Sequence, residues 1–279
     1  MRRKDFLNAR NGDKVVVKIT VWPNGRQKAE GTITEILGKK GDVGIDIISI
    51  IKDKDLPLDF PKEVKEAAQL VPQVIPKKDL KGRLDRRKWP IITVDGVDSK
   101  DLDDAIYAEK RGENYFLGVY IADVSHYVRP RGELDREAYA RGTSVYLVDR
   151  VLPMLPPLLS NGICSLNEGE ERLTMSCEMV ISGKTGKVLS YDIAPSVIAS
   201  RHRMNYPDVA KILTDVTRPA GKIQRYCAYV GTMEELCTIL HKKRVRRGAI
   251  EFEIPEVKVI LDEKNGPSTF ICGTEPLRK

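Results

Sequence analysis

Five aspartates fall within the ten residues from Asp95 to Asp104, where Lys100 is the only basic residue. Like charges this close repel one another, so a fold that gathers them is costly unless cations neutralise them. Apolar, strand-like segments lie on both sides of the run, at residues 89–94 and 105–107. We therefore expect a strand–loop–strand arrangement that ends one strand at Asp95 and carries the later aspartates across the loop.

The ligand chemistry of this acidic run favours a hard divalent cation. Carboxylate oxygens select Mg²⁺, Mn²⁺ or Ca²⁺ over zinc. The spacing D-x5-D-x-D-D supplies carboxylates at Asp95, Asp101, Asp103 and Asp104, and two cations about 4 Å apart can clamp the attacking and leaving oxygens of a phosphodiester. An EF-hand loop fits poorly, because Ile106 occupies the required glycine position when counting starts at Asp101. An acidic surface loop is the alternative that the spacing leaves open.

Length and composition are those of an ordinary globular protein. The 279 residues suit one large or two ordinary domains, and 41% of them are hydrophobic. No apolar run is long enough to span a membrane, and no secretory signal follows Met1. The five cysteines form no CxxC pair and there are only three histidines, so a zinc framework is improbable. An odd, scattered set of cysteines suits a reducing compartment. We expect a cytoplasmic protein with no membrane association.

The charge balance indicates an anionic partner. Lysine and arginine number 47 against 40 acidic residues, a net charge of +7, which favours nucleic acid modestly. Residues 77–88 contain seven basic and two acidic side chains. This segment is either a solvated linker or a basic collar that contacts phosphates. The candidate RNA-binding residues in the collar are Lys81, Arg83, Arg86 and Arg87.

Hydrophobic patterning predicts an α+β chain. Short Val- and Ile-rich segments between glycine turns predict three strands of a small β-barrel, at residues 13–19, 30–37 and 43–50. A helix over 62–70 precedes the collar, and the pattern becomes mixed α/β from residue 91. The elements expected there are a strand region over 114–128, a helix over 134–141, a strand pair at 174–181 and 188–198, and helices over 206–213 and 222–246.

Several long motifs resemble the catalytic domain of the ribonuclease R / ribonuclease II (RNB) family of exoribonucleases, with closer similarity to the ribonuclease R branch. They are TVDGVDSKDLDDAI (93–106), YIADVSHYV (120–128), residues 134–179 and RRGAIEFEIPEVKVIL (246–261). Residues 11–38 are similar to the cold-shock-type RNA-binding barrel that precedes that domain. The resemblance implies a partial OB-like (cold-shock-type) barrel over 1–52, a linker over 53–90, and a truncated RNB catalytic domain of mixed α/β structure over 91–279.

The resemblance also implies a function. Members of the family are processive hydrolases that shorten single-stranded RNA from its 3′ end and release nucleoside 5′-monophosphates. They need Mg²⁺, with Mn²⁺ as a substitute, and no other small-molecule cofactor. Asp95, Asp101, Asp103 and Asp104 match the family's four active-site aspartates; Asp95 and Asp104 are the first choices as direct metal ligands. Tyr146 matches the position of a base-stacking aromatic ring, whereas its sequence context alone predicts a half-buried core tyrosine.

Four further polar residues lie outside the set of candidate metal ligands. Asp98 lies inside the acidic run but off the four family positions, so we expect it either to belong to the loop structure or to support the metal ligands without touching the ion. Asp123 lies in an apolar segment, where an unpaired carboxylate is costly, and a hydrogen-bonded structural role is expected. His126 is expected to be structural as well. For Arg172, contact with a phosphate and a structural salt bridge remain equal alternatives.

After Leu261 the resemblance ends. The family continues there into a helical portion that carries a second stacking aromatic and a catalytic arginine, followed by an RNA-binding S1 barrel. We therefore expect a fragment that is weakly active or inactive, since the arginine would stabilise developing phosphate charge. Two other functions stay open: a non-catalytic RNA-binding module, and an unrelated two-metal enzyme acting on nucleotides or DNA.

Overall fold

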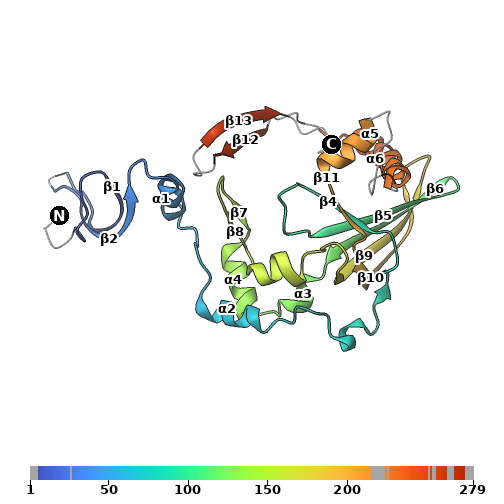
Figure 1. Cartoon of the computed structure of the whole chain (residues 1–279), viewed down its shortest axis with the longest axis horizontal. Helices are drawn as coiled ribbons and strands as arrows, with labels where there is room; N and C mark the ends of the chain where they lie inside the picture. The colour runs from blue at the N-terminus through green and yellow to red at the C-terminus, as the bar shows by residue number, and fades with distance from the viewer. Residues whose placement is uncertain are drawn as a thin grey trace. The chain divides into compact units, whose positions relative to one another are not determined.

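Figure 1 shows the computed structural model of the chain. It describes residues 6–25, 27–214, 224, 226–250, 252, 256–262 and 267–273. The chain divides into two compact units. The first comprises Met1–Phe60, Arg141–Met154 and Pro255–Gly273, and the second comprises Pro61–Ala140, Leu155–Ile254 and Thr274–Lys279. The acidic run and the basic collar both belong to the second unit.

Among its described residues, the first unit contains three pairs of antiparallel strands. They are β1 (Asp13–Val21) with β2 (Glu30–Lys39), β7 (Val145–Tyr146) with β8 (Val151–Leu152), and β12 (Glu256–Leu261) with β13 (Pro267–Gly273). The pairing of β1 with β2 confirms the first two strands that the sequence predicts. Register shifts interrupt this ladder at three places, where the strands twist and bend.

The third predicted strand, over 43–50, is wrong. These residues lie in and before helix α1 (Ile45–Asp53), which follows Gly44 at φ 80°. Ile45 and Ile51 are the buried residues of α1. Asp46 in the first turn forms an ion pair with Lys14 of β1. The β-branched composition misled the prediction because strand propensity is weak and context overrides it.

A seven-stranded sheet forms the frame of the second unit, in the order β11-β4-β5-β6-β9-β10-β3. The strands are β3 (Leu84–Asp85), β4 (Ile92–Asp95), β5 (Asp104–Arg111), β6 (Asn114–Ala122), β9 (Glu171–Ser182), β10 (Val188–Ala199) and β11 (His202–Asn205). Neighbours from β4 through β10 are antiparallel, while β11 runs parallel to β4 and β3 parallel to β10. The predicted strand pair at 174–181 and 188–198 is confirmed as β9 and β10.

The helices of the second unit largely match the predicted ones. They are α2 (Lys62–Gln69), the 3-10 turn η2 (Lys77–Leu80), α3 (Val124–Tyr127), α4 (Glu133–Arg141), the π-helical turn η3 (Leu158–Ile163), α5 (Tyr206–Thr214) and α6 (Cys227–Arg246). Residues 222, 223 and 225, where the last predicted helix starts, lie outside the described residues. The predicted strand region 114–128 is wrong beyond Ala122. Asp123 ends that strand, because its carboxylate accepts a hydrogen bond from Ser125 and pairs with Arg83.

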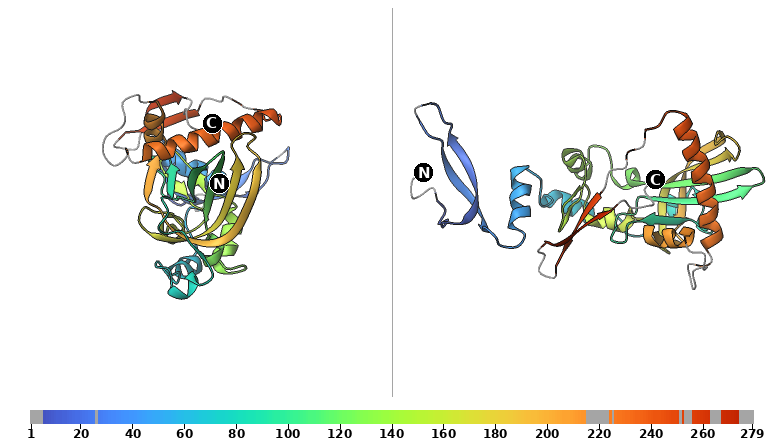
Figure 2. Two further views of the ribbon diagram at one scale, coloured as in Figure 1. Left: turned by 90° about the vertical axis from the view of Figure 1, so that its right-hand side faces the viewer. Right: turned by 90° about the horizontal axis from the view of Figure 1, so that it is seen from above.

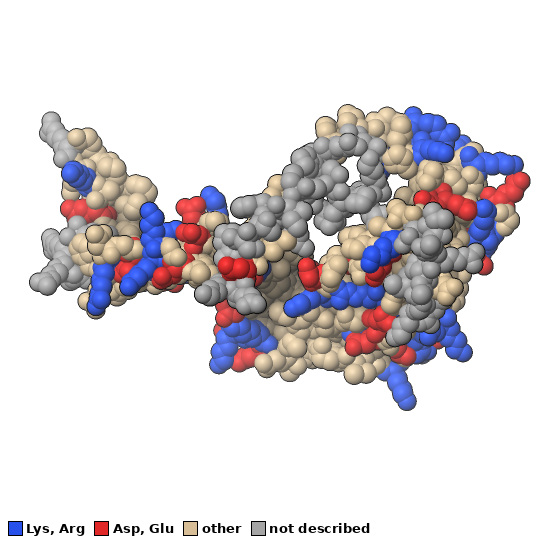
Figure 3. Space-filling view, turned by 45° about the horizontal axis from the view of Figure 1, so that its top comes forward, with Lys and Arg blue, Asp and Glu red and all other residues tan. Residues whose placement is uncertain are grey.

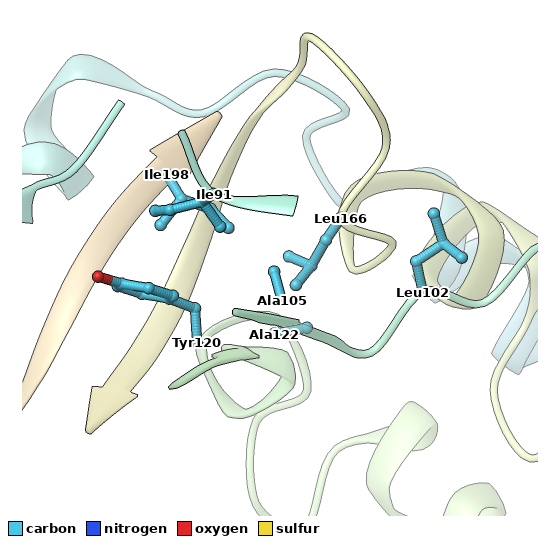
Figure 4. Close-up of a cluster of buried hydrophobic side chains, with 7 residues drawn as sticks. All are labelled: Ile91, Leu102, Ala105, Tyr120, Ala122, Leu166 and Ile198. Carbon is cyan, nitrogen blue, oxygen red and sulfur yellow. The ribbon is translucent and has the colours of Figure 1, made fainter. Parts of the chain in front are cut away.

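Both faces of the sheet carry apolar clusters. One cluster is shown in Figure 4, where Leu166 lies between Leu102 and the sheet residues. On the opposite face, α5 and α6 cover the strands (Figure 2), with Leu236 of α6 packed against Tyr115 and Ile181. Among the helices in the described parts of the chain, none has both the length and the apolar character needed to cross a membrane.

Candidate active site

The acidic run forms the connection between two neighbouring antiparallel strands. Asp95 is the last residue of β4 and Asp104 is the first residue of β5. The loop between them, residues 96–103, carries Asp101 and Asp103 and is called the acidic loop below. The predicted strand–loop–strand arrangement is therefore confirmed. It places two of the four carboxylates at the ends of adjacent strands and the other two on the loop that joins them.

The four carboxylates lie close enough to affect one another's charge. Partial burial and the charge of Asp104 raise the pKa of Asp95 to about 6, with smaller contributions from Asp101 and Asp103, while Arg203 acts in the opposite direction. Desolvation and the charges of Asp101 and Asp104 also raise the pKa of Asp103. Mutual repulsion of this kind disfavours full ionisation and favours a bound cation that would relieve it.

One carboxylate oxygen in this group lacks a partner. Oδ2 of Asp95 is buried and has no hydrogen-bond partner among the described residues. A buried, unpaired carboxylate oxygen is costly, and a hard cation would satisfy it. The all-oxygen donor set fits Mg²⁺ or Mn²⁺. However, no group of three or more His, Cys, Asp or Glu side chains in the described part of the chain is already arranged to hold a metal ion.

A buried leucine anchors the acidic loop between two of its aspartates. Leu102 is fully buried and belongs to the apolar cluster in Figure 4. Its backbone N–H donates to Oγ of Ser165 at 3.1 Å, and its carbonyl accepts from the N–H of Leu166 at 2.9 Å. The Ser165 hydroxyl in turn donates to the carbonyl of Lys100 at 2.8 Å. These contacts fix the backbone on both sides of Leu102, and with it the positions of Asp101 and Asp103.

Arg172 supports the segment that holds Leu102. Its side chain is buried, and Nε donates to the carbonyl of Ser165 at 2.7 Å. Nη2 donates to the carbonyl of Gly162 at 3.2 Å and also pairs with Glu170. Of the two alternatives for Arg172, the structural one is confirmed. Sequence reasoning missed Leu102 and Ser165, although one apolar residue within an acidic run is a recognisable signal of an anchor.

Two arginines of the basic collar form ion pairs with carboxylates of the same domain. Arg83 forms a buried ion pair with Asp123 at 2.6 Å, and Arg86 forms a two-bond ion pair with Glu178 at 2.6 and 2.9 Å. Burial opposes the ionisation of Asp123, but hydrogen bonds from Arg83 and Ser125 outweigh it and lower its pKa. The expected structural role of Asp123 is confirmed. The predicted RNA contacts of Arg83 and Arg86 compete with these pairs, because removing one partner leaves a buried charge.

Lys81 and Arg87, the other two collar residues, are more accessible. Lys81 is exposed. Arg87 pairs with Asp85 and Glu171 through side chains that remain at least one-third exposed, and such surface pairs are weak enough to exchange for a phosphate. Basic and acidic side chains are interspersed over the described residues of the face in Figure 3. RNA contact by Lys81 and Arg87 stays a prediction, and it would break weaker ion pairs than RNA contact by the half-buried Arg83 and Arg86.

Tyr146 lies in the first unit, in β7, where it pairs with Val151 of β8. Its side chain is 66% exposed. The half-buried core position suggested by its sequence context is therefore wrong, and the ring presents accessible surface of the kind that a nucleobase stacks on. Base stacking by Tyr146 stays a prediction.

Comparison with known proteins places this architecture in a family. The RNB domain model matches residues 83–275, and a Cold shock domain model matches residues 1–61. The chain belongs to the RNB family. The predicted fold class, a cold-shock-type segment followed by a mixed α/β RNB domain, is confirmed.

Members of the RNB family with high similarity include two bacterial proteins. The chain is 46% identical over 256 residues to Ribonuclease R 1 of Lactococcus lactis, covering 91% of this chain and 31% of the relative. It is 48% identical over 259 residues to Ribonuclease R of Thermotoga maritima, covering 91% and 36%. The chain thus spans about a third of the length of these relatives.

A solved structure of the family has the same fold. Mycoplasma genitalium RNase R, in complex with ribose methylated single-stranded RNA, superimposes with a TM-score of 0.88 at 27% identity. The match covers 96% of this chain and 42% of that protein.

Proposed function

We propose that the protein is a hydrolytic exoribonuclease that shortens single-stranded RNA from the 3′ end and releases nucleoside 5′-monophosphates. The observation that carries this proposal is the set of four aspartates around the β4–β5 connection in an RNB fold, with a buried, unpartnered oxygen on Asp95. Relatives named Ribonuclease R support the reaction, and a neighbour bound to single-stranded RNA supports the partner. We also propose a cytoplasmic location, from the scattered cysteines.

The four aspartates divide the work of holding Mg²⁺, for which Mn²⁺ would substitute. Asp95 and Asp104, at the ends of adjacent strands, would hold the cation directly, and Asp101 and Asp103 would complete the site from the loop and orient a second cation or the attacking water. A bound cation neutralises charge on the phosphate and lowers the pKa of an attacking water. Tyr146 stacks on a base without selecting among the four.

A second candidate function is an RNA-binding module without catalysis. The Cold shock domain match over residues 1–61 and the exposed basic side chains of the collar favour it. In this function the cold-shock-type strands and the exposed collar residues Lys81 and Arg87 bind RNA.

A cleavage assay separates the two functions. The chain is incubated with 5′-labelled single-stranded RNA and Mg²⁺, and we expect a ladder of stepwise-shortened products that forms slowly and that EDTA abolishes. The matching DNA oligomer should resist shortening, because the 2′-hydroxyl distinguishes RNA from DNA. RNA that is bound but never shortened would favour the module, and equal degradation of DNA would favour a different two-metal nuclease.

The raised pKa of Asp95 predicts a stability gain when its charge is removed. Because its folded-state pKa of about 6 exceeds the ordinary 3.8, stability falls as pH rises from about 4 to about 6 and stays low above that. In EDTA at pH 7.5, Asp95→Asn should add about 1–2 kcal/mol, allowing for solvent screening, which raises Tm by about 2–8 °C. At pH 4 the gain should vanish. Thermal unfolding followed by circular dichroism measures both, and an equal gain at the two pH values would contradict the repulsion argument.

A further inference from the structure

Arg203 reaches from β11 to the acidic loop. Its Nη2 donates to the carbonyl of Ser99 at 2.5 Å and to that of Val97 at 2.9 Å, and it lies 3.5 Å from the carbonyl of Gly96. One guanidinium nitrogen thus contacts three carbonyls within four residues. All three belong to the part of the loop between Asp95 and Asp101, so the arginine holds this segment by its backbone.

The backbone of Arg203 is itself held firmly. β11 runs parallel to β4 with Arg203 opposite Thr93, and the next residue, Met204, is almost fully buried. The Arg203 N–H donates to the carboxylate of Glu168 at 2.9 Å. That carboxylate also lies 3.0 Å from Nδ1 of His202. The guanidinium therefore extends from a fixed strand and can impose its position on the loop.

The two anchors of the acidic loop act on different halves. Leu102 and Ser165 fix the half that contains Asp101 and Asp103, whereas Arg203 fixes the half that follows Asp95. A guanidinium suits this task because it is planar and pre-organised, so that Nη2 is held among several carbonyls, which a lysine ammonium on a flexible stem achieves less well. Without Arg203, residues 96–99 would be held only at their two ends, by β4 and by the contacts of Ser165 with Lys100 and Leu102.

We propose that Arg203 is a positioning residue that holds residues 96–99 so that Asp95 and the loop aspartates can share one cation site. The inference deepens the proposed function and rests on its metal site. It predicts that the arginine matters for metal binding before any RNA is present. A direct contact with the RNA phosphate is the alternative role for an arginine near such a site.

The test measures Mn²⁺ binding to the chain in the absence of RNA, by electron paramagnetic resonance at pH 7.5, for the parent, Arg203→Met and Arg203→Lys. Support for metal ligands is commonly worth 10- to 100-fold in affinity, so we expect Arg203→Met to weaken binding about 10-fold, with Arg203→Lys intermediate. Amide hydrogen exchange across residues 96–101 should speed up in the same order. Arg201→Met, a change at an exposed arginine two residues away, is the matched control and should leave both readouts unchanged.

The outcomes separate this inference from the metal site itself. Parental Mn²⁺ affinity in Arg203→Met, with weaker RNA binding, would overturn the positioning role in favour of phosphate contact. A parent chain that binds no Mn²⁺ would overturn the metal site and this inference together. If Arg203→Met fails to fold, Arg203→Lys decides: parental affinity and parental exchange rates in that variant would count against the inference, and weakened binding with faster loop exchange would support it.

Discussion

Replacing Asp103 by asparagine is expected to slow the shortening of single-stranded RNA by about 10³-fold, the loss typical of removing one group that stabilises charge in a transition state. Asparagine keeps the shape of the side chain but removes the negative charge that would hold a cation. Asp103 is exposed at the end of the acidic loop, next to the first residue of β5, so the fold should tolerate the change. Single-turnover assays with 5′-labelled RNA and Mg²⁺ measure the rate.

RNA affinity distinguishes a catalytic effect from a structural one. Because Asp103 holds a cation and does not contact a base in the proposed function, Asp103→Asn should bind RNA within about twofold of the parent, as judged by fluorescence anisotropy in Ca²⁺. Asp98→Asn is the control, since Asp98 shares the loop but lies outside the four family positions. A parental cleavage rate in Asp103→Asn would remove this residue from the metal site.

The second large effect is expected from the apolar anchor of the loop. Leu102→Ala should reduce the free energy of unfolding by about 3 kcal/mol, because deleting a fully buried leucine side chain leaves a cavity among well-packed neighbours. The corresponding fall in Tm is about 6–12 °C. Metal binding should weaken too, since Asp101 and Asp103 flank the anchor. Urea denaturation measures the stability, and Mn²⁺ titration at a temperature where the variant is folded measures the site.

Val97→Ala is the matched control for the anchor. Val97 belongs to the same loop but is 61% exposed, so its truncation should change stability by less than about 0.5 kcal/mol. Equal losses in the two variants would show that the loop is sensitive to any truncation. A loss in Leu102→Ala below about 1 kcal/mol would mean that neighbouring side chains fill the space, and that the anchor has little influence on the aspartates.

Local patterns predicted the frame of the site correctly. The apolar segment before Asp95 and the one after Asp104 indicated two strands, and β4 and β5 end and begin at those residues. Strand and helix periodicity likewise indicated β9, β10 and α5. Such predictions succeed where the spacing of apolar residues within one segment is enough to favour a strand or a helix.

Local patterns failed where a distant contact decided the outcome. Residues 43–50 have strand-forming composition, yet they form most of α1, with Ile45 and Ile51 buried. The basic collar reads as a surface for RNA, yet Arg83 and Arg86 pair with Asp123 and Glu178, which lie 40 and 92 residues further along the chain. The composition gives the number of basic residues, but it does not tell which of them form ion pairs within the folded domain.

The amino-acid sequence by itself determined the family, the four carboxylates and the strand–loop–strand frame that carries them, because all of these depend on residue identity and short spacing. Only the tertiary structure decided how the acidic loop is held. Ser165 and Arg203 contact it from 63 to 107 residues away, and no spacing rule connects positions that far apart. The physical reason is that strand order in the sheet, set by burial of its two apolar faces, brings these anchors to the loop.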